Sequence, residues 1–196
     1  MSFEALSTAL AALRGVAEGV APDQIARPTP CTDWTVGQVL MHAAADQHVW
    51  AATVGSAAGP GYNPIDPPRG AEGGVARVVQ EAVDAATATW AGVDSSAETL
   101  PTPLPPVPTL PADLAAAAAA LDAAIHAWDV AVSTGQPSPL TGALAGQLRP
   151  AAEATAEQLR GFAYAAPLPG APTDDEASAL LRYLGRDPHW AGGREC

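Results

Sequence analysis

The stretch that decides the fold is ADLAAAAAALDAAIHAWDVAVS, residues 112–133. Alanine has the highest helix propensity and a very small side chain, so this run predicts a long helix that packs closely against its neighbours. Gly135 follows as a candidate cap. Asp122 interrupts the apolar run, and a carboxylate facing other helices would be costly there without a partner. We therefore expect this helix at the centre of an all-α protein.

Three further long helices are predicted on the N-terminal side of this run. Apolar residues recur at helical spacing over about residues 3–17, 36–50 and 75–90, and clusters of glycine and proline end each stretch. The proline-rich connection at residues 99–111 should be extended and semi-rigid. No alternating β-branched run predicts a strand. The expected fold class is all-α, a four-helix bundle with short accessory helices.

The C-terminal third predicts the accessory helices. A helical stretch covers residues 139–162 and contains Pro150, so we expect a break near Gln147 and a restart at Pro150. A last short helix is expected over residues 174–184, and it begins with three acidic residues that suit a positive helix end. A length of 196 residues fits a single domain over residues 1–196.

The composition excludes several classes of protein. Twenty-one acidic residues stand against nine basic ones, all arginine, and the net charge of −12 argues against binding nucleic acid. The two cysteines, Cys31 and Cys196, do not make a disulfide framework. The N-terminus lacks the basic region of a secretory signal, and no segment reads as a membrane span. We expect a soluble, cytoplasmic protein that acts on a small molecule. The sequence is compatible with a homodimer.

Two helices carry residues with the spacing of metal ligands. His42 and Asp46 lie four apart in one helix, and Asp122 and His126 lie four apart in the central one, where such pairs have Cβ atoms about 5–6 Å apart. Facing helices of a bundle can converge such side chains on one ion. His42, Asp122 and His126 would supply two nitrogens and one oxygen with open positions. Zinc accepts this set, and so does non-haem iron.

Simpler interpretations exist for the same residues. A lone helical histidine is more often a packing or surface residue, and an Asp–His pair often only stabilises its helix. His48 lies off the His42 face and is expected to be exposed. Asp129 could orient a ligand histidine or sit in a polar contact between helices. Cys31 could be a thiol nucleophile, a wall of the site or partly buried packing.

Three segments together resemble one family. They are PTPCTDWTV at 28–36 followed by LMH at 40–42, DAAIHAWD at 122–129, and LGRDPHW at 184–190. In this order they resemble the actinobacterial metal-binding branch of the DinB superfamily, which is similar to the N-terminal domain of mycothiol-dependent maleylpyruvate isomerase. The resemblance implies a four-helix bundle with crossover connections and a divalent metal, usually zinc or nickel. By position, its ligands would be His42, Asp122 and His126.

The resemblance also implies a function. Characterised relatives are low-molecular-weight thiol transferases or thiol-dependent isomerases in which the metal binds and activates the thiol. We therefore expect a metal-dependent mycothiol S-transferase or thiol-dependent isomerase acting on a small electrophile. A thiol-independent Lewis-acid isomerase, cyclase or hydrolase in specialised metabolism, or a non-catalytic metal- or ligand-binding module, are the alternatives. Candidate hydrogen-bonding groups for the sugars of mycothiol are Gln47, Tyr62, Asn63 and Arg186.

Two departures from the family pattern limit this transfer. Asp122 is one methylene shorter than the glutamate of the isomerase, so an ion would have to lie closer to the central helix. The sequence also continues only a little beyond Trp190, without the additional C-terminal domain of the isomerase. Of the properties that the resemblance implies, specificity for maleylpyruvate is therefore the one least expected in this protein.

Overall fold

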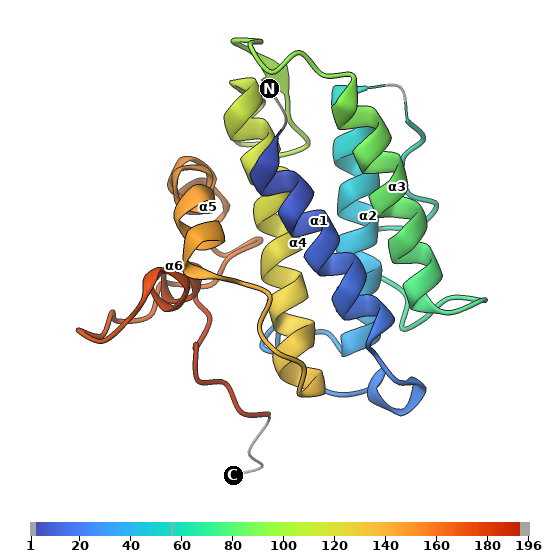
Figure 1. Cartoon of the computed structure of the whole chain (residues 1–196), viewed down its shortest axis with the longest axis vertical. Helices are drawn as coiled ribbons and strands as arrows, with labels where there is room; N and C mark the ends of the chain where they lie inside the picture. The colour runs from blue at the N-terminus through green and yellow to red at the C-terminus, as the bar shows by residue number, and fades with distance from the viewer. Residues whose placement is uncertain (1–2, 56, 193–196) are drawn as a thin grey trace.

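The alanine-rich run forms the central helix of the molecule. In the computed structural model, which describes residues 3–55 and 57–192, it is α4 (Ala112–Thr134), and residues on all its faces are buried (Figure 1). Gly135 ends it in the left-handed conformation at φ 76°. By length and hydropathy α4 could cross a membrane, but 83% of its apolar window is buried inside the protein. This is the pattern of a core helix surrounded by other helices.

Three long helices surround α4 as the sequence predicts. They are α1 (Glu4–Glu18), α2 (Val36–Val54) and α3 (Val75–Ala91), and α1 and α2 each pack against both α3 and α4. Gln136, just beyond α4, donates a hydrogen bond to the carbonyl of Val16 near the end of α1, so these two helices are parallel. Gln47 of α2 donates to the carbonyl of Ala119 in α4. Figure 1 shows that α2 runs antiparallel to α1 and α4.

This arrangement requires crossover connections. Helices α2 and α3 are neighbours that run in the same direction, so residues 57–74 return along the bundle from the α2 end to the start of α3 (Figure 1). The connection is tied to α2 by the Tyr62 hydroxyl, which donates to the carbonyl of Met41 at 2.7 Å. The four-helix bundle with crossover connections is thus confirmed, and one crossover lies against the half of α2 that carries His42.

The proline-rich connection differs from the prediction in one detail. It contains two very short antiparallel strands, β1 (Leu100–Pro101) and β2 (Thr109–Leu110), with Leu100 paired to Leu110. The prediction that no strand forms is therefore wrong here. An extended, proline-rich chain that reverses direction within a few residues brings its own backbone groups into pairing distance, and no alternating pattern is needed for so short a ladder.

The accessory helices lie on one side of the bundle. They comprise α5 (Gly142–Thr155), which packs on α4 and α1, and α6 (Glu176–Tyr183), which packs on α5. Short 3-10 turns, η1 (Pro22–Gln24) and η2 (Ala156–Leu159), follow α1 and α5. The predicted break before Pro150 is wrong, because α5 continues through it. Buried Leu148 and Ala151 on either side hold the helix against the bundle despite the missing N–H.

Candidate metal centre

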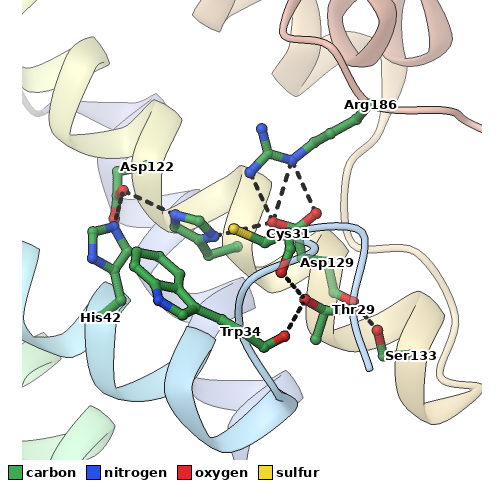
Figure 2. A network of polar contacts seen from close by, with 9 residues as sticks. Thr29, Cys31, Trp34, His42, Asp122, Asp129, Ser133 and Arg186 are labelled. Carbon is green, nitrogen blue, oxygen red and sulfur yellow. Dashed lines mark hydrogen bonds and ion pairs between the residues drawn. The ribbon is translucent and has the colours of Figure 1, made fainter. Parts of the chain in front are cut away.

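Two facing helices bring the three predicted ligands together. His42 projects from α2, and Asp122 and His126 project from α4. Oδ1 of Asp122 lies 3.6 Å from Nε2 of His42 and 3.4 Å from Nε2 of His126, and one donor atom of each residue lies within 4.8 Å of the others. Figure 2 shows His42 and Asp122 directed at each other. His42 and Asp122 are 80 residues apart in the sequence, and the antiparallel packing of α2 on α4 brings their side chains together.

The second ring nitrogen of each histidine, Nδ1, has a hydrogen-bond partner within the protein. Nδ1 of His42 lies 2.8 Å from the carbonyl oxygen of Pro64, and Nδ1 of His126 lies 3.0 Å from Oδ2 of Asp129. Both acceptors require an N–H, so each neutral ring carries its hydrogen on Nδ1 and a lone pair on Nε2. Two nitrogen lone pairs and a carboxylate oxygen therefore face one another. A cation among them would be favourable, because all three atoms offer electron pairs.

The distances fit a shared ion better than direct hydrogen bonds. A charge-assisted N–H···O bond is about 2.7–2.9 Å long, shorter than either His–Asp122 distance. Metal–ligand bonds of about 2.0–2.2 Å place the donor atoms of a tetrahedral site about 3.3–3.6 Å apart. The two distances to Asp122 match this range, while the full set of three donor atoms lies within 4.8 Å. In addition, Oδ2 of Asp122 is buried and has no hydrogen-bond partner. The residues present therefore fit a divalent metal ion.

The loop before α2 explains why His42 lies where it does. The hydroxyl of Thr29 donates to the carbonyls of Cys31 and Trp34, at 3.0 and 2.9 Å, and closes this loop (Figure 2). Thr35 then begins α2 with a capping box, in which its hydroxyl accepts from the backbone N–H of Gln38. The Trp34 ring lies 4.5 Å from the His42 ring, centroid to centroid. The PTPCTDWT segment thus fixes the start of α2 and covers one face of the histidine.

A buried ion pair stands behind His126. Asp129, fully buried on α4, accepts from His126 and also from the Arg186 guanidinium, whose Nε and Nη2 lie 2.9 Å from its two oxygens (Figure 2). Of the two interpretations of Asp129, the orientation of His126 is the one that this geometry supports. Burial alone would raise the pKa of Asp129, but Arg186 and His126 hold it below its ordinary value.

The ionisable groups at the centre change one another's pKa. Burial disfavours an imidazolium at His126, but the carboxylates of Asp122 and Asp129 outweigh it and raise the pKa of His126 to about 9. Burial likewise opposes ionisation of Asp122, yet the charges of His126 and His42 hold its pKa below the usual range. Without a metal, a proton on His126 therefore supplies the positive charge that the lone pairs require.

Two further groups that the sequence did not assign to the centre are affected by its charges. Burial and the charge of Asp122 raise the pKa of Asp46 well above its usual value. Burial and the charges of Asp122 and Asp46 also raise the pKa of Tyr164, in the turn after α5 and η2. The spacing of Asp46 from His42 was a usable signal. Nothing in the sequence marked Tyr164.

Other predicted candidates lie elsewhere or have other partners. His48 is half-buried rather than exposed, with a buried Nδ1 that lacks a hydrogen-bond partner, and it stays outside the three-residue set. Cys31 is half-buried, packs against the core and lies beside Asp129 and Arg186, and burial raises the pKa of its thiol to about 11. Of its three interpretations, partly buried packing is the one that this geometry supports. Cys196 lies outside the described residues.

The four groups suggested for the sugars of mycothiol are occupied within the protein. Gln47 donates to the Ala119 carbonyl, Tyr62 to the Met41 carbonyl and Arg186 to Asp129, while the Asn63 side chain accepts from the backbone of Ile65. Arg186 in particular is only 10% exposed at its side chain. The structure thus gives these four side chains structural partners, and the suggestion that they bind a sugar finds no support in it.

Comparisons with known proteins identify the family of the chain. The family model described as "Mycothiol maleylpyruvate isomerase N-terminal domain" matches residues 6–131, more than half of the chain. The chain therefore belongs to this family, which is part of the DinB-like superfamily. The match includes His42, Asp122, His126 and Asp129, and it ends before Tyr164 and Arg186.

Two mycobacterial proteins resemble the chain over nearly its full length. They are "Uncharacterized protein MT0763" of Mycobacterium tuberculosis (strain CDC 1551 / Oshkosh) and "Uncharacterized protein Rv0738" of Mycobacterium tuberculosis (strain ATCC 25618 / H37Rv). Each is 31% identical over 199 residues, covering 95% of this chain and 96% of the relative. No solved structure gives a significant match.

Proposed function

We propose that this protein binds one divalent metal ion, zinc or nickel, through His42, Asp122 and His126, and uses it to activate the thiol of mycothiol. The thiol would act on a small electrophile, in an S-transferase or a thiol-dependent isomerase reaction. The observation that carries the proposal is the convergence of two histidine lone pairs and a carboxylate oxygen in a bundle interior. Membership of the mycothiol-related family supports the choice of thiol.

The chain's own residues would have clear parts in this reaction. Three ligands leave coordination positions free, and a bound ion supplies the chemistry of lowering the pKa of a thiol that enters one of them. The Pro64 carbonyl and Asp129 hold the two imidazoles with Nε2 inward. Trp34 covers the His42 ring and limits access of water to that side. In the transfer, the thiol would lose its proton to solvent water and its sulfur would bond to the electrophilic carbon. A π bond or the bond to a leaving group at that carbon would break at the same time, and the atom that receives this electron pair would take up a proton from water.

The charge of the protein narrows the substrate class. A net charge of −12 and the absence of lysine disfavour polyanionic substrates such as nucleotides. Arg186, the arginine beside the centre, is held by Asp129 and is not free to bind an anion. A small neutral electrophile suits this site best.

Metal analysis tests the ligand set. Purified wild-type protein should carry about one divalent ion per chain, and His126→Ala should lose most of it because one of three protein ligands is gone. His48→Ala is the matched control, since it removes a helical histidine of α2 outside the set and should keep the metal. Full loading of His126→Ala, measured by elemental analysis, would show that the ligand assignment is wrong.

Cobalt substitution tests the thiol. If mycothiol enters the coordination shell, the cobalt protein should develop a sulfur-to-metal charge-transfer absorption when mycothiol is added. It should also conjugate a model electrophile faster than metal-free protein, and Cys31→Ser should keep that rate. A spectrum unchanged at saturating mycothiol, with metal still required for turnover of a carbonyl substrate, would replace the thiol-transfer proposal with Lewis-acid chemistry.

A further inference from the structure

We propose that Arg186 is a positioning residue for the metal centre, and that it acts through Asp129 on the ligand histidine His126. This inference rests on the proposed metal binding. It assigns a part in the site to the C-terminal segment, which lies outside the residues matched by the family model.

The Asp129 carboxylate is the point where the two interactions meet. Its Oδ2 accepts from Nδ1 of His126 at 3.0 Å and from Nη2 of Arg186 at 2.9 Å, while Oδ1 accepts from Nε of Arg186 at 2.9 Å. The fork of the guanidinium therefore holds both oxygens at once and fixes the rotation of the carboxylate. With that rotation fixed, Oδ2 is aimed at Nδ1 of His126, and Nε2 of the same ring is aimed at Asp122.

The burial of the pair makes this orientation depend on Arg186. The Asp129 side chain is 0% exposed and that of Arg186 is 10% exposed, so water cannot replace the guanidinium without local opening. A buried carboxylate that loses its one cationic partner is left with an uncompensated charge, so it turns toward whatever donor or water it can reach. His126 would then lose the fixed acceptor that keeps its hydrogen on Nδ1 and its lone pair on the metal side.

The chain around Arg186 is built to deliver this side chain. Gly185 has φ 80°, and an added Cβ there would lie 2.8 Å from Cβ of Ala165 and 2.9 Å from the carbonyl oxygen of Ala166. The backbone N–H of Arg186 bonds to the carbonyl of Leu181 at 2.8 Å. The chain just after α6 thus packs closely against the turn at residues 160–166. Arg186 extends from this contact to α4 (Figure 2).

The alternative is that the ion pair only docks the C-terminal segment. Arg182 provides a matched control for that role, because it belongs to the same segment and its Nε forms a 2.9 Å ion pair with Asp174. That pair involves no residue of the metal centre. Loss of docking would affect Arg182 and Arg186 variants alike, whereas loss of positioning would affect only Arg186 variants.

Zinc affinity, measured by competition with a chromophoric chelator, provides the test. Arg186→Met should weaken zinc binding by about 10–100-fold, the usual effect of removing a group that orients a metal ligand. Arg182→Met should change it less than about 2-fold. Arg186→Lys, which restores the charge but not the fork, should recover part of the loss, and Arg186→Gln should not. Circular dichroism establishes that each variant is folded.

An isosteric variant covers the case in which Arg186→Met does not fold. Asp129→Asn keeps the shape of the Asp129 side chain but lacks the carboxylate that accepts from both His126 and Arg186. It should weaken zinc binding to a similar degree. NMR of the zinc-loaded protein adds a second measurement, the exchange of the His126 Nδ1–H. This exchange would not change if the ion pair only docked the C-terminal segment. The His126 Nδ1–H signal, protected in wild type and Arg182→Met, should exchange rapidly in Arg186→Gln.

The outcomes separate this inference from the proposed function. Wild-type protein that binds neither zinc nor nickel would overturn both. Tight wild-type binding with equal affinity in Arg186→Met, or in Asp129→Asn if the former is unfolded, would overturn the positioning role alone. Equal losses in Arg182→Met and Arg186→Met would also overturn it in favour of docking.

Discussion

Cys31 shows how the surroundings of one residue decide its chemistry. Its thiol lies in the loop that leads into α2, next to the Asp129–Arg186 pair (Figure 2). Burial and the negative charge of Asp129 raise the pKa of the thiol to about 11, and Arg186 only partly compensates. The thiolate is the reactive form, so a raised pKa predicts low reactivity of this side chain near neutral pH.

We expect slow alkylation of Cys31 as a result. At pH 8 only about one thiol in a thousand is ionised when its pKa is near 11, so iodoacetamide should label Cys31 at least about 100-fold more slowly than a free cysteine. The measurement is the labelling rate against pH, by mass spectrometry, in a Cys196→Ser background that leaves one thiol. Rapid labelling of the folded protein at pH 8 would instead indicate an accessible, activated thiol.

At the same scale, the site was predictable only in part. His42, Asp122 and His126 could be found because helical spacing and an apolar context make a lone carboxylate conspicuous. Arg186 was noticed but given the wrong partner, since 57 residues separate it from Asp129 and no periodic pattern spans that distance. Tyr164 lies in an irregular turn, where sequence carries no signal for which way a side chain points.

At the scale of helices and loops, periodicity predicted the long helices well. The strict repeat of apolar residues sets where a helix lies, because each helix must bury one face. Pro150 misled the prediction, since its local penalty was weighed without the burial of α5 on α4 and α1. The crossover topology followed only from the family resemblance. Helix direction depends on connections such as residues 57–74, whose course the apolar pattern does not encode.

The junction after α6 offers a test of how tightly the C-terminal segment is packed. Gly185 and Gly135 have similar positive φ angles, 80° and 76°, so alanine is strained at both. At Gly135 the added Cβ meets open space, whereas at Gly185 it meets Ala165 and Ala166. We expect Gly135→Ala to lower the free energy of unfolding by about 1 kcal/mol and Gly185→Ala by at least about 2 kcal/mol.

Urea unfolding followed by circular dichroism measures both changes against wild type. Gly135→Ala serves as the control for backbone strain alone. A loss at Gly185→Ala no larger than at Gly135→Ala would mean that the contact with residues 165–166 yields easily, and that the segment carrying Arg186 is loosely held.

At the scale of the whole molecule, the centre links folding stability to protons and to metal. The pKa of His126 rises from an ordinary value of 6.5 to about 9 in the folded, metal-free protein. A histidine with a raised pKa stabilises the fold fully below pH 6.5, and this contribution is lost as pH rises through about 9. Its size is at most about 3 kcal/mol. The metal-free protein should therefore lose stability across this range, because its buried lone pairs and carboxylate lose their cation.

Zinc should reverse this trend. A bound ion replaces the proton, and its binding strengthens as proton competition ends, so the zinc-induced rise in melting temperature should grow steadily from pH 6.5 to pH 9. Thermal unfolding of zinc-loaded and chelator-treated protein, measured by circular dichroism at several pH values, gives this difference directly. His126→Ala should abolish its growth with pH, while His48→Ala should preserve it. A difference that stays constant or shrinks toward pH 9 would mean that zinc and the His126 proton do not compete for the same position among His42, Asp122 and His126.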